Sequence, residues 1–271
     1  MKDIVENRSR IGLTSKMRLA LIAVRENGLP YLAYLGISYL GDSLSNFGFR
    51  RSDELRRAKN LPGMNSRAAN RYIWDNWDWS AQGDEWTPSD AWKKSVVKNF
   101  IDRYFRGVES IIEIGPGAGR WTEYLVTGTK RLVGIDISQT CVDECRKRFA
   151  TSRNASFELG NGIDLQSTPT ASVDRIWSFD VFVHINRAEF ASYVSEFARV
   201  LRDGGMGAIH HGSFGGSSGG WRSNVTITDV RELMSKNSFE IVSQVQSWTD
   251  GSDEHQAGLY GDTITVFRKS H

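Results

Sequence analysis

Ser110-Ile111-Ile112-Glu113-Ile114-Gly115-Pro116-Gly117-Ala118-Gly119-Arg120-Trp121 is the stretch on which the fold depends. Its apolar run of β-branched residues is typical of a buried parallel strand, and the glycines that follow predict a tight turn into a helix beginning near Trp121. Such a turn lets a ligand approach the backbone closely. Arginine at position 120 gives the pattern G-x-G-x-G, whereas a dinucleotide-binding turn has its third glycine one position later. The spacing therefore argues against NAD or FAD.

Length, charge and cysteine content narrow the class of protein. The 271 residues suffice for one catalytic domain with an N-terminal extension, and 34 basic against 32 acidic residues give no overall field that would recruit nucleic acid. The two cysteines, Cys141 and Cys145, have a spacing that suits neither a disulfide framework nor a four-ligand zinc site. The sequence shows no signal peptide and no run of about 20 apolar residues. We therefore expect a cytoplasmic protein that is neither secreted nor integral to a membrane.

The N-terminal segment, residues 1–60, mixes basic residues with short apolar groups. Residues 17–24 have amphipathic helical character, and residues 29–37 are apolar and aromatic but interrupted by Pro30 and Gly36. Such a segment could cover the catalytic domain, dock another chain, or rest peripherally on the anionic inner surface of a membrane. Residues 61–65, which contain Pro and Gly, indicate a loop and a boundary.

Five tryptophans follow between Tyr72 and Trp92, interleaved with acidic residues. The tryptophans are Trp74, Trp77, Trp79, Trp86 and Trp92, and the acidic residues are Asp75, Asp78, Asp84 and Glu85. A nucleic-acid surface would need lysine and arginine beside the stacking rings. A sugar site fits better, because ring faces pack on the apolar faces of pyranoses while carboxylates accept hydrogen bonds from hydroxyl groups. The plainer alternative is the packed core of a lid.

Downstream of the glycine turn, apolar runs alternate with amphipathic segments, as in a parallel α/β sheet. The expected helices start near 87–90 (running to Tyr104), at 122, near 142, at 190 and at 228, and the further strands are expected over 131–137, 156–159, 172–185, 206–211, 239–248 and 262–268. Asp136 ends the second strand, 21 positions after Gly115. A carboxylate there can accept hydrogen bonds from both hydroxyls of a ribose, although it can also serve as a cap for the helix from Ser138 onward.

Together these features resemble the class I S-adenosylmethionine-dependent methyltransferases. Glu113 stands before the glycine turn where that family has an acidic residue, and residues 199–205, Arg-Val-Leu-Arg-Asp-Gly-Gly, are similar to a stretch of that family. The resemblance covers residues 95–271 and implies a Rossmann-like α/β fold, with a seven-stranded sheet, a reversed last strand and helices on both faces. We expect a mainly helical N-terminal extension with a tryptophan-rich lid over residues 1–94, and an S-adenosylmethionine-binding methyltransferase domain over residues 95–271.

The resemblance also implies which residues surround S-adenosyl-L-methionine. They are Glu113, Gly115, Gly117, Gly119, Asp136, Ile137, Asn161 and Gly162. In this scheme Asp136 holds the ribose hydroxyls. Many relatives have aspartate where Asn161 stands, and the asparagine carbonyl can still accept a hydrogen bond from the adenine amino group.

Methyl transfer is an in-line displacement in which the enzyme aligns donor and acceptor and removes a proton from a hydroxyl acceptor. Residues just past the carboxyl ends of the strands face the reaction. His184, after the fourth strand, is the first candidate for the general base; His211 is the second, and Asp180 lies nearby. A divalent metal at Asp180 is the competing account. The fifth strand ends in His210-His211-Gly212 rather than an acid pair, which suits magnesium poorly, so we expect no metal.

Three functions remain open at this point. The first is O-methylation of a sugar, glycan or glycosylated small molecule, which the tryptophan-rich segment favours. The second is methylation of a lipid-linked or other small-molecule hydroxyl at a membrane surface, which the basic N-terminal segment favours. The third is a non-catalytic adenosyl-binding partner protein. None of them involves nucleic acid, and each is compatible with a homo-oligomer.

Overall fold

The computed structural model describes residues 65–215, 222–258 and 260–270, together with residues 29–61 except positions 31, 32, 34, 35, 38, 39, 49, 53, 56, 57 and 60. The chain divides into two compact units, residues 1–61 and 62–271. The division falls at the loop that the sequence indicates at residues 61–65. In the first unit, every described residue from 29 to 58 is helical. Among the described residues, no helix has both the length and the apolar character needed to cross a bilayer.

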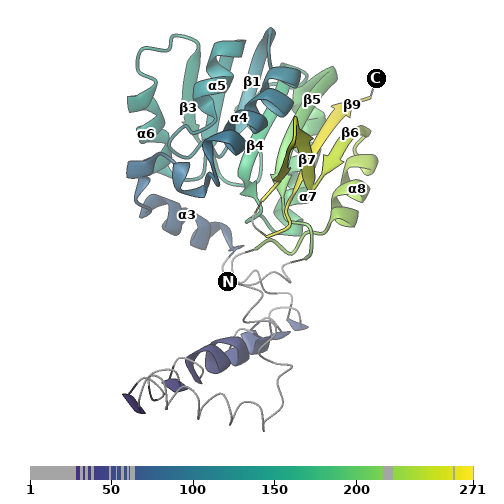
Figure 1. The fold of residues 1–271 in the computed structure, drawn as a ribbon. Helices are drawn as coiled ribbons and strands as arrows, with labels where there is room; N and C mark the ends of the chain where they lie inside the picture. Colours follow the sequence, from purple (N-terminus) through teal and green to yellow (C-terminus); the bar gives the residue numbers. More distant parts are fainter. Residues whose placement is uncertain are drawn as a thin grey trace. The chain divides into compact units, whose positions relative to one another are not determined.

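The second unit alternates strands and helices along the chain (Figure 1). Its helices are α3 (Arg67–Asp75), α4 (Asp90–Val96), α5 (Thr122–Leu125), α6 (Gln139–Arg148), α7 (Arg187–Val200) and α8 (Ile227–Lys236). Its strands are β1 (Val108–Ile114), β2 (Thr129–Asp136), β3 (Ala155–Leu159), β4 (Val173–Phe182), β5 (Leu201–His211), β6 (Phe239–Val245), β7 (Ser247–Asp250), β8 (Asp253–Gln256) and β9 (Thr263–Lys269). Two 3-10 turns, Trp79–Ala81 and Asp84–Trp86, lie between α3 and α4, and a π-helical stretch, Val97–Asp102, continues α4.

Seven strands form one sheet in the order β3-β2-β1-β4-β5-β9-β6. Neighbouring strands pair in parallel across β3, β2, β1, β4 and β5. In contrast, β9 runs antiparallel to both of its neighbours, β5 and β6. This arrangement confirms the predicted Rossmann-like sheet with a reversed last strand.

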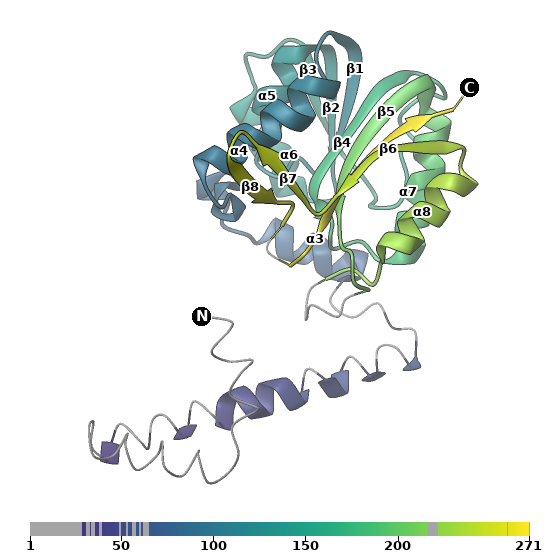
Figure 2. The same cartoon turned by 45° about the vertical axis from the view of Figure 1, so that its right-hand side comes forward.

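The C-terminal region also contains a hairpin that the sequence did not indicate. The prediction of one strand over residues 239–248 is wrong at its end, because β6 stops at Val245 and Ser247 begins a separate hairpin, β7–β8 (Figure 2). Trp248 of this hairpin donates a hydrogen bond from its indole nitrogen to the hydroxyl of Ser95 in α4 (2.8 Å). The alternation of apolar residues continues through the break, so hydropathy alone could not show it.

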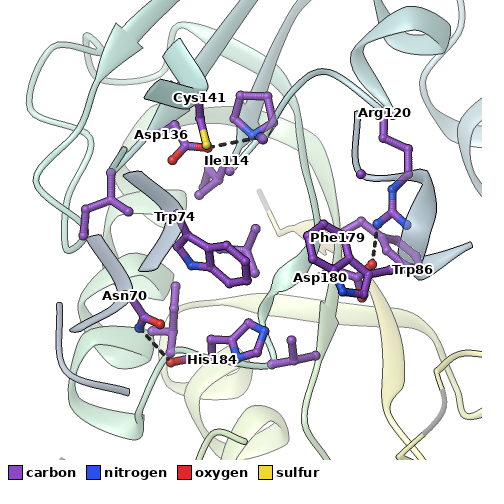
Figure 3. Close-up of a pocket in the computed structure, with 18 of the residues that line it drawn as sticks. Asn70, Trp74, Trp86, Ile114, Arg120, Asp136, Cys141, Phe179, Asp180 and His184 are labelled. Atoms are coloured by element: carbon purple, nitrogen blue, oxygen red, sulfur yellow. Dashed lines mark hydrogen bonds and ion pairs between the residues drawn. The ribbon is translucent and has the colours of Figure 1, made fainter. Parts of the chain in front are cut away.

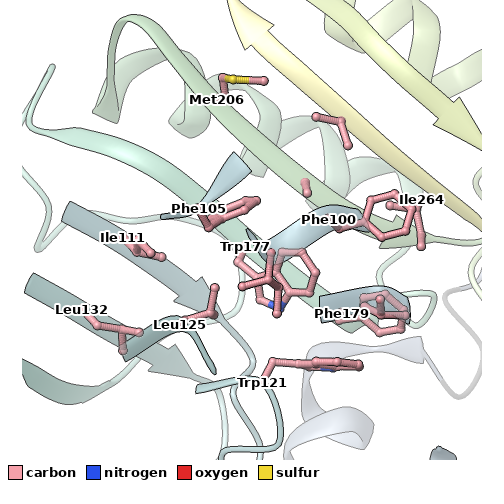
Figure 4. Close-up of a cluster of buried hydrophobic side chains, with 14 of the residues drawn as sticks. Phe100, Phe105, Ile111, Trp121, Leu125, Leu132, Trp177, Phe179, Met206 and Ile264 are labelled. Atoms are coloured by element: carbon pink, nitrogen blue, oxygen red, sulfur yellow. The ribbon is translucent and has the colours of Figure 1, made fainter. Parts of the chain in front are cut away.

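Helices cover both faces of the sheet. One apolar cluster joins α4, α5 and α6 to the sheet around the buried rings of Trp121 and Trp177, whose centroids are 6.0 Å apart (Figure 4). A second cluster joins α7 and α8 to the other face, where Phe197 stacks on Phe267 of β9. The neighbouring residues of β1 at positions 111 and 112 belong to different clusters, because adjacent strand residues point to opposite faces.

Local capping signals fix the starts of the helices that surround the site. Ser89 caps α4, as the sequence predicts for a start near residues 87–90, and its hydroxyl accepts a hydrogen bond from the backbone N–H of Trp92 (3.1 Å). Ser138 caps α6 in the same way. Thr226 and Asp229 form a capping box at the start of α8. These caps hold the turns that follow β2 and β5 in place.

Candidate functional site

A cavity of about 560 Å³ lies at the carboxyl ends of β1, β2 and β4 (Figure 3). The volume is in the range of about 300–1,000 Å³ that is usual for small-molecule sites, and ligands of open α/β sheets bind at this edge. Its walls are the glycine turn, the end of β2 and the loop after β4. A further wall comes from α3 and the 3-10 turns. These elements all belong to the unit of residues 62–271.

The glycine turn brings the backbone directly against the cavity. Gly115 and Gly117 line the cavity and have positive φ angles of 65° and 58°, a conformation that disfavours side chains. A Cβ atom on Gly117 would lie 3.0 Å from the ring of Trp79, and one on Gly115 would lie 2.2 Å from Val181. Gly119 does not line the cavity; a Cβ atom there would lie 2.4 Å from the ring of Phe149, so this glycine serves packing.

Asp136 lies in the cavity wall opposite the glycine turn's backbone. Its carboxylate accepts hydrogen bonds from the backbone N–H groups of Gly117 (3.1 Å) and Ser138 (2.9 Å), one on each oxygen. Each oxygen keeps a further lone pair for a ligand hydroxyl. Burial raises the pKa of Asp136 to about 6, although these two backbone hydrogen bonds act in the opposite direction. The N-cap of α6 is Ser138 itself, and Asp136 supports that cap by accepting the hydrogen bond from its backbone N–H.

Glu113 lies beneath the turn rather than in the cavity wall. It is buried, and the hydroxyl of Thr122 donates a hydrogen bond to its Oε2 (2.6 Å). Burial raises the pKa of Glu113 to about 8, although the hydrogen bond from Thr122 acts in the opposite direction. Its side chain is therefore mainly neutral at pH 7 and joins β1 to the helix that follows the turn.

The predicted adenine contact at Asn161 does not match the geometry. Asn161 does not line the cavity, and its Oδ1 accepts hydrogen bonds from the backbone N–H groups of Ile163 (2.9 Å) and Asp164 (3.1 Å). These bonds close the turn after β3. Ile137 and Gly162, in contrast, do line the cavity beside Asp136.

Five buried or half-buried ionisable groups form a charge chain near the cavity, and the sequence alone indicated neither their pairing nor the part played by Arg120, Arg222 and Asp262. The five groups are Arg120, Asp180, His210, Asp262 and Arg222. Arg120 pairs with Asp180, and Arg222 pairs with Asp262. His210 lies between the two carboxylates, with Nδ1 2.9 Å from Asp180 Oδ1 and Nε2 3.7 Å from Asp262 Oδ2. The arginines and aspartates line the cavity, and Figure 3 shows the Arg120–Asp180 pair across it from Asp136.

Asp180 is held in an unfavourable conformation by this chain. Its φ angle of 61° is in the left-handed region, which costs energy for a residue with a Cβ atom. Burial alone would raise the pKa of Asp180, but the Arg120 charge and the hydrogen bond from His210 hold it well below its usual range. Such a weakly basic carboxylate is a poor proton acceptor and a good partner for a cation. The geometry therefore argues against the role of Asp180 as a base.

His184 lies in the cavity wall, as expected for the first candidate base. Its ring is 5.5 Å from the ring of Trp74 in an edge-on arrangement, and its backbone carbonyl accepts a hydrogen bond from Asn70 Nδ2 (3.3 Å). Figure 3 shows His184, Asn70 and Trp74 grouped on one side of the cavity. The imidazole of His184 and the amide of Asn70 thus meet on one side of the cavity.

The geometry at the second candidate base, His211, does not suit catalysis. Its side chain is fully buried and does not line the cavity. Nδ1 donates to the backbone carbonyl of Gly212 (2.7 Å), and Nε2 accepts from the hydroxyl of Thr265 (2.7 Å). Burial lowers the pKa of His211 to about 4. Both ring nitrogens serve the packing of β5 against β9, so we do not retain His211 as a base.

The tryptophans face the cavity, but their acidic neighbours do not. Trp74, Trp77, Trp79, Trp86 and Trp92 all line it, and the first four contact one another with ring centroids 5.3–6.0 Å apart. The acids bond locally: Asp75 with Ser138, Asp78 with Ser80, Asp84 with Lys93, and Glu85 with Trp77. The prediction of carboxylates facing a ligand beside the stacking rings is therefore wrong for these four acids, because none of them lines the cavity and each is engaged by another protein group.

Two asparagine side chains, rather than the acids, supply polar groups beside the tryptophan rings. The side-chain oxygens of Asn65 and Asn70 are buried in the cavity wall and have no hydrogen-bond partner among the described residues. Their amide nitrogens are engaged, with the backbone carbonyl of Arg222 (2.6 Å) and that of His184, respectively. A buried acceptor without a donor is costly, so the cavity favours a ligand that donates hydrogen bonds here.

The described residues contain no group of three or more histidine, cysteine, aspartate or glutamate side chains arranged to hold a metal ion. Asp180, the position at which a metal would be expected, is instead paired with Arg120.

Comparison with known proteins gives this geometry a family context. The family model for a methyltransferase domain matches residues 111–205. A probable S-adenosylmethionine-dependent methyltransferase of Mycolicibacterium smegmatis is 32% identical over 96 residues, which is 35% of this chain and 35% of that protein. An uncharacterised transposon protein of Streptomyces fradiae is 33% identical over 129 residues, 45% of this chain and 35% of that protein. The chain thus spans about a third of the length of these curated relatives.

Solved structures share the fold at low sequence identity. A Leishmania major S-adenosylmethionine-dependent methyltransferase aligns with a TM-score of 0.59 and 13% identity over 79% of this chain and 90% of its own. A chain from the complex of the Haloferax volcanii Trm112 methyltransferase activator with a putative methyltransferase aligns with a TM-score of 0.58 and 20% identity. The alignment covers 74% of this chain and 97% of that chain. The N-methyltransferase NodS of Bradyrhizobium japonicum, bound to S-adenosylhomocysteine, aligns with a TM-score of 0.52 and 16% identity. The alignment covers 73% of this chain and 93% of that chain. Residues 111–205 therefore match the family model for a methyltransferase domain, and the unit that contains them shares the fold of these solved methyltransferase structures.

Proposed function

We propose that this protein is an S-adenosylmethionine-dependent O-methyltransferase whose acceptor is a sugar, a glycan or a glycosylated small molecule. The observation that carries the proposal is the presence, in one cavity, of a wall of tryptophan rings and of the Asn65 and Asn70 amide oxygens, for which the described part of the chain offers no hydrogen-bond donor. The amide oxygens can accept hydrogen bonds from ligand hydroxyl groups, and the tryptophan rings can pack on apolar ligand faces. A pyranose offers both.

The cofactor fits along the glycine turn and β2. Asp136 would accept hydrogen bonds from the ribose hydroxyls, with Ile137 and Gly162 beside the adenosine. Across the cavity, the methionyl end carries a carboxylate and an ammonium group, which match the charges of Arg120 and Asp180. Glycine at position 117 lets the backbone of the turn lie against the Trp79 ring, which a Cβ atom there would approach to 3.0 Å.

The chemistry asks little of the protein beyond alignment and proton removal. When bound, S-adenosylmethionine supplies an activated methyl group on sulfur. His184 would accept the proton of the acceptor hydroxyl, whose oxygen would take the methyl group, and the product S-adenosylhomocysteine would keep the electron pair of the carbon–sulfur bond. Asn70, which contacts His184, orients the acceptor through its free oxygen. The tryptophan wall limits the access of water.

The test is transfer of label from S-[methyl-¹⁴C]adenosylmethionine to a panel of glycosides, sugar nucleotides, phenols and amines. We expect alkali-stable label on a sugar hydroxyl. Label found only on amine or phenol acceptors would contradict the proposed acceptor while leaving the cofactor assignment intact. Cofactor binding without transfer to any acceptor would favour the non-catalytic partner protein.

Asn70→Ala separates acceptor recognition from cofactor binding. We expect it to raise the KM for the acceptor about tenfold, because a buried hydrogen bond is lost, and to leave the Kd for S-adenosylhomocysteine within about twofold. Asn76→Ala is the matched control, since Asn76 caps the end of the same helix outside the cavity. Equal effects of both substitutions on KM would remove Asn70 from the acceptor site.

A further inference from the structure

The described helical residues of the N-terminal unit include a row of exposed apolar side chains. These side chains are between 49% and 70% exposed: Leu29, Ile37, Leu40, Leu44, Phe47 and Leu55. At about 100° per residue, these positions fall within an arc of about 80°, so they form one narrow stripe along the helix. The polar residues Ser45 and Asn46 lie outside that arc. An exposed stripe of this kind marks a binding surface rather than an ordinary solvent-facing helix.

The sequence around the stripe favours an interface with lipid. Residues 29–41 contain no charged side chain and include three tyrosines, a residue type enriched where hydrocarbon meets water. The uncharged run is shorter than the roughly 20 residues needed to span a bilayer. A helix with these features lies in the plane of a membrane, with its apolar face among the acyl chains.

The net charge of the N-terminal segment indicates which kind of surface it would bind. Residues 1–59 contain eleven basic and six acidic residues, a net charge of +5, whereas residues 60–271 contain 23 basic and 26 acidic residues, a net charge of −3. Packing this segment against a second copy would bring two positive segments together. An anionic lipid surface is complementary to it, because each nearby lysine or arginine adds attraction to such a surface.

We propose that the described helical residues between positions 29 and 58 dock this protein peripherally on an anionic membrane, with the stripe inserted and the flanking basic residues against lipid headgroups. The proposal does not depend on the identity of the methyl acceptor. It would hold the methyltransferase domain close to the membrane surface.

Co-sedimentation of the full chain with vesicles tests this docking. The vesicles are phosphatidylcholine alone and an equimolar mixture with phosphatidylglycerol. We expect binding to the mixed vesicles, weaker binding at high salt, and little binding to phosphatidylcholine alone. Leu40→Gln with Leu44→Gln should lower the partition coefficient at least about tenfold, because two inserted apolar side chains are lost. The matched control, Ser45→Gln with Asn46→Gln, should bind within about twofold of wild type, since these positions lie off the stripe.

Two further measurements keep the test decisive. The Kd for S-adenosylhomocysteine should be the same in both double variants, which shows that residues 62–271 remain folded. Light scattering without lipid should give the same mass for all three proteins. The absence of binding to mixed vesicles, or equal binding by the stripe variant, would overturn the proposal. A fall in mass confined to the stripe variant would identify a second copy of the chain as the occupant instead.

Discussion

Asp136→Asn should weaken cofactor binding without destabilising the folded protein. The carboxylate of Asp136 already accepts one backbone N–H on each oxygen, and a bound ribose would add charge-assisted hydrogen bonds to the remaining lone pairs. Loss of the charge should cost about 1.5–3 kcal/mol of binding free energy. This corresponds to a rise in Kd of roughly ten- to 150-fold.

The effect on stability should have the opposite sign. Burial raises the pKa of Asp136 to about 6 from its usual 3.8, so the unfolded chain loses its proton at lower pH than the folded protein. The wild type therefore loses stability as pH rises from about 4 to about 6, by about 3 kcal/mol in all. Asparagine does not titrate. Relative to wild type, the free energy of unfolding of the variant should thus rise by about 2 kcal/mol between pH 4.5 and pH 7. This rise partly offsets any cost of placing the asparagine amide beside a backbone N–H.

Calorimetric titration with S-adenosylhomocysteine and urea unfolding at both pH values measure the two effects. In the wild type, affinity should rise about tenfold per pH unit below pH 6 and be constant above it, because only the carboxylate form accepts both hydroxyls. The variant should show a flat profile. A Kd within twofold of wild type at pH 7, together with a flat wild-type profile, would refute the assignment of Asp136 to the ribose.

Four other substitutions, at three positions, test separate parts of the site. Glu113→Gln should leave the Kd for the cofactor within about twofold of wild type and should not destabilise the protein at pH 7. The stability of the variant relative to wild type should grow from about pH 4.5 to about pH 8, where Glu113 of the folded wild type ionises. Destabilisation of the variant in urea at pH 7 would count against a neutral Glu113. Gly117→Leu should abolish calorimetric binding of S-adenosylhomocysteine in a folded protein, because its side chain would meet Trp79; retained affinity would move the cofactor away from the turn. His184→Ala and His184→Gln should both lower kcat/KM by a factor on the order of 10²–10⁴ while cofactor affinity stays the same, and near-wild-type turnover of the Gln variant would assign His184 a structural role.

The sheet could be predicted from sequence because each of its determinants is local. The β-branched run before Gly115, the acid that ends β2 and the cap at Ser138 each act within a few residues, and strand order followed from the family resemblance. The break between β6 and β7 escaped prediction, because it depends on the packing of Trp248 against α4, some 150 residues earlier in the chain.

The candidate site was only partly predictable for the same reason. Asp136 and His184 follow strands directly, so topology alone brings them to the cavity. The charge chain joins residues from five separate segments, and Arg222 and Asp262 lie in loops without any sequence signal. Burial also decided between His184 and His211: both follow strands, but only the former faces the cavity, and sequence does not reveal which strand-end side chain finds its hydrogen-bond partners inside the core.

A crystal structure of the full chain with S-adenosylhomocysteine tests the central claim most directly. The account predicts the ribose hydroxyls within about 2.6–3.2 Å of the Asp136 carboxylate, with the sulfur facing the side of the cavity that holds His184 and Asn70. A ligand bound elsewhere, or one whose ribose makes no contact with Asp136, would contradict it.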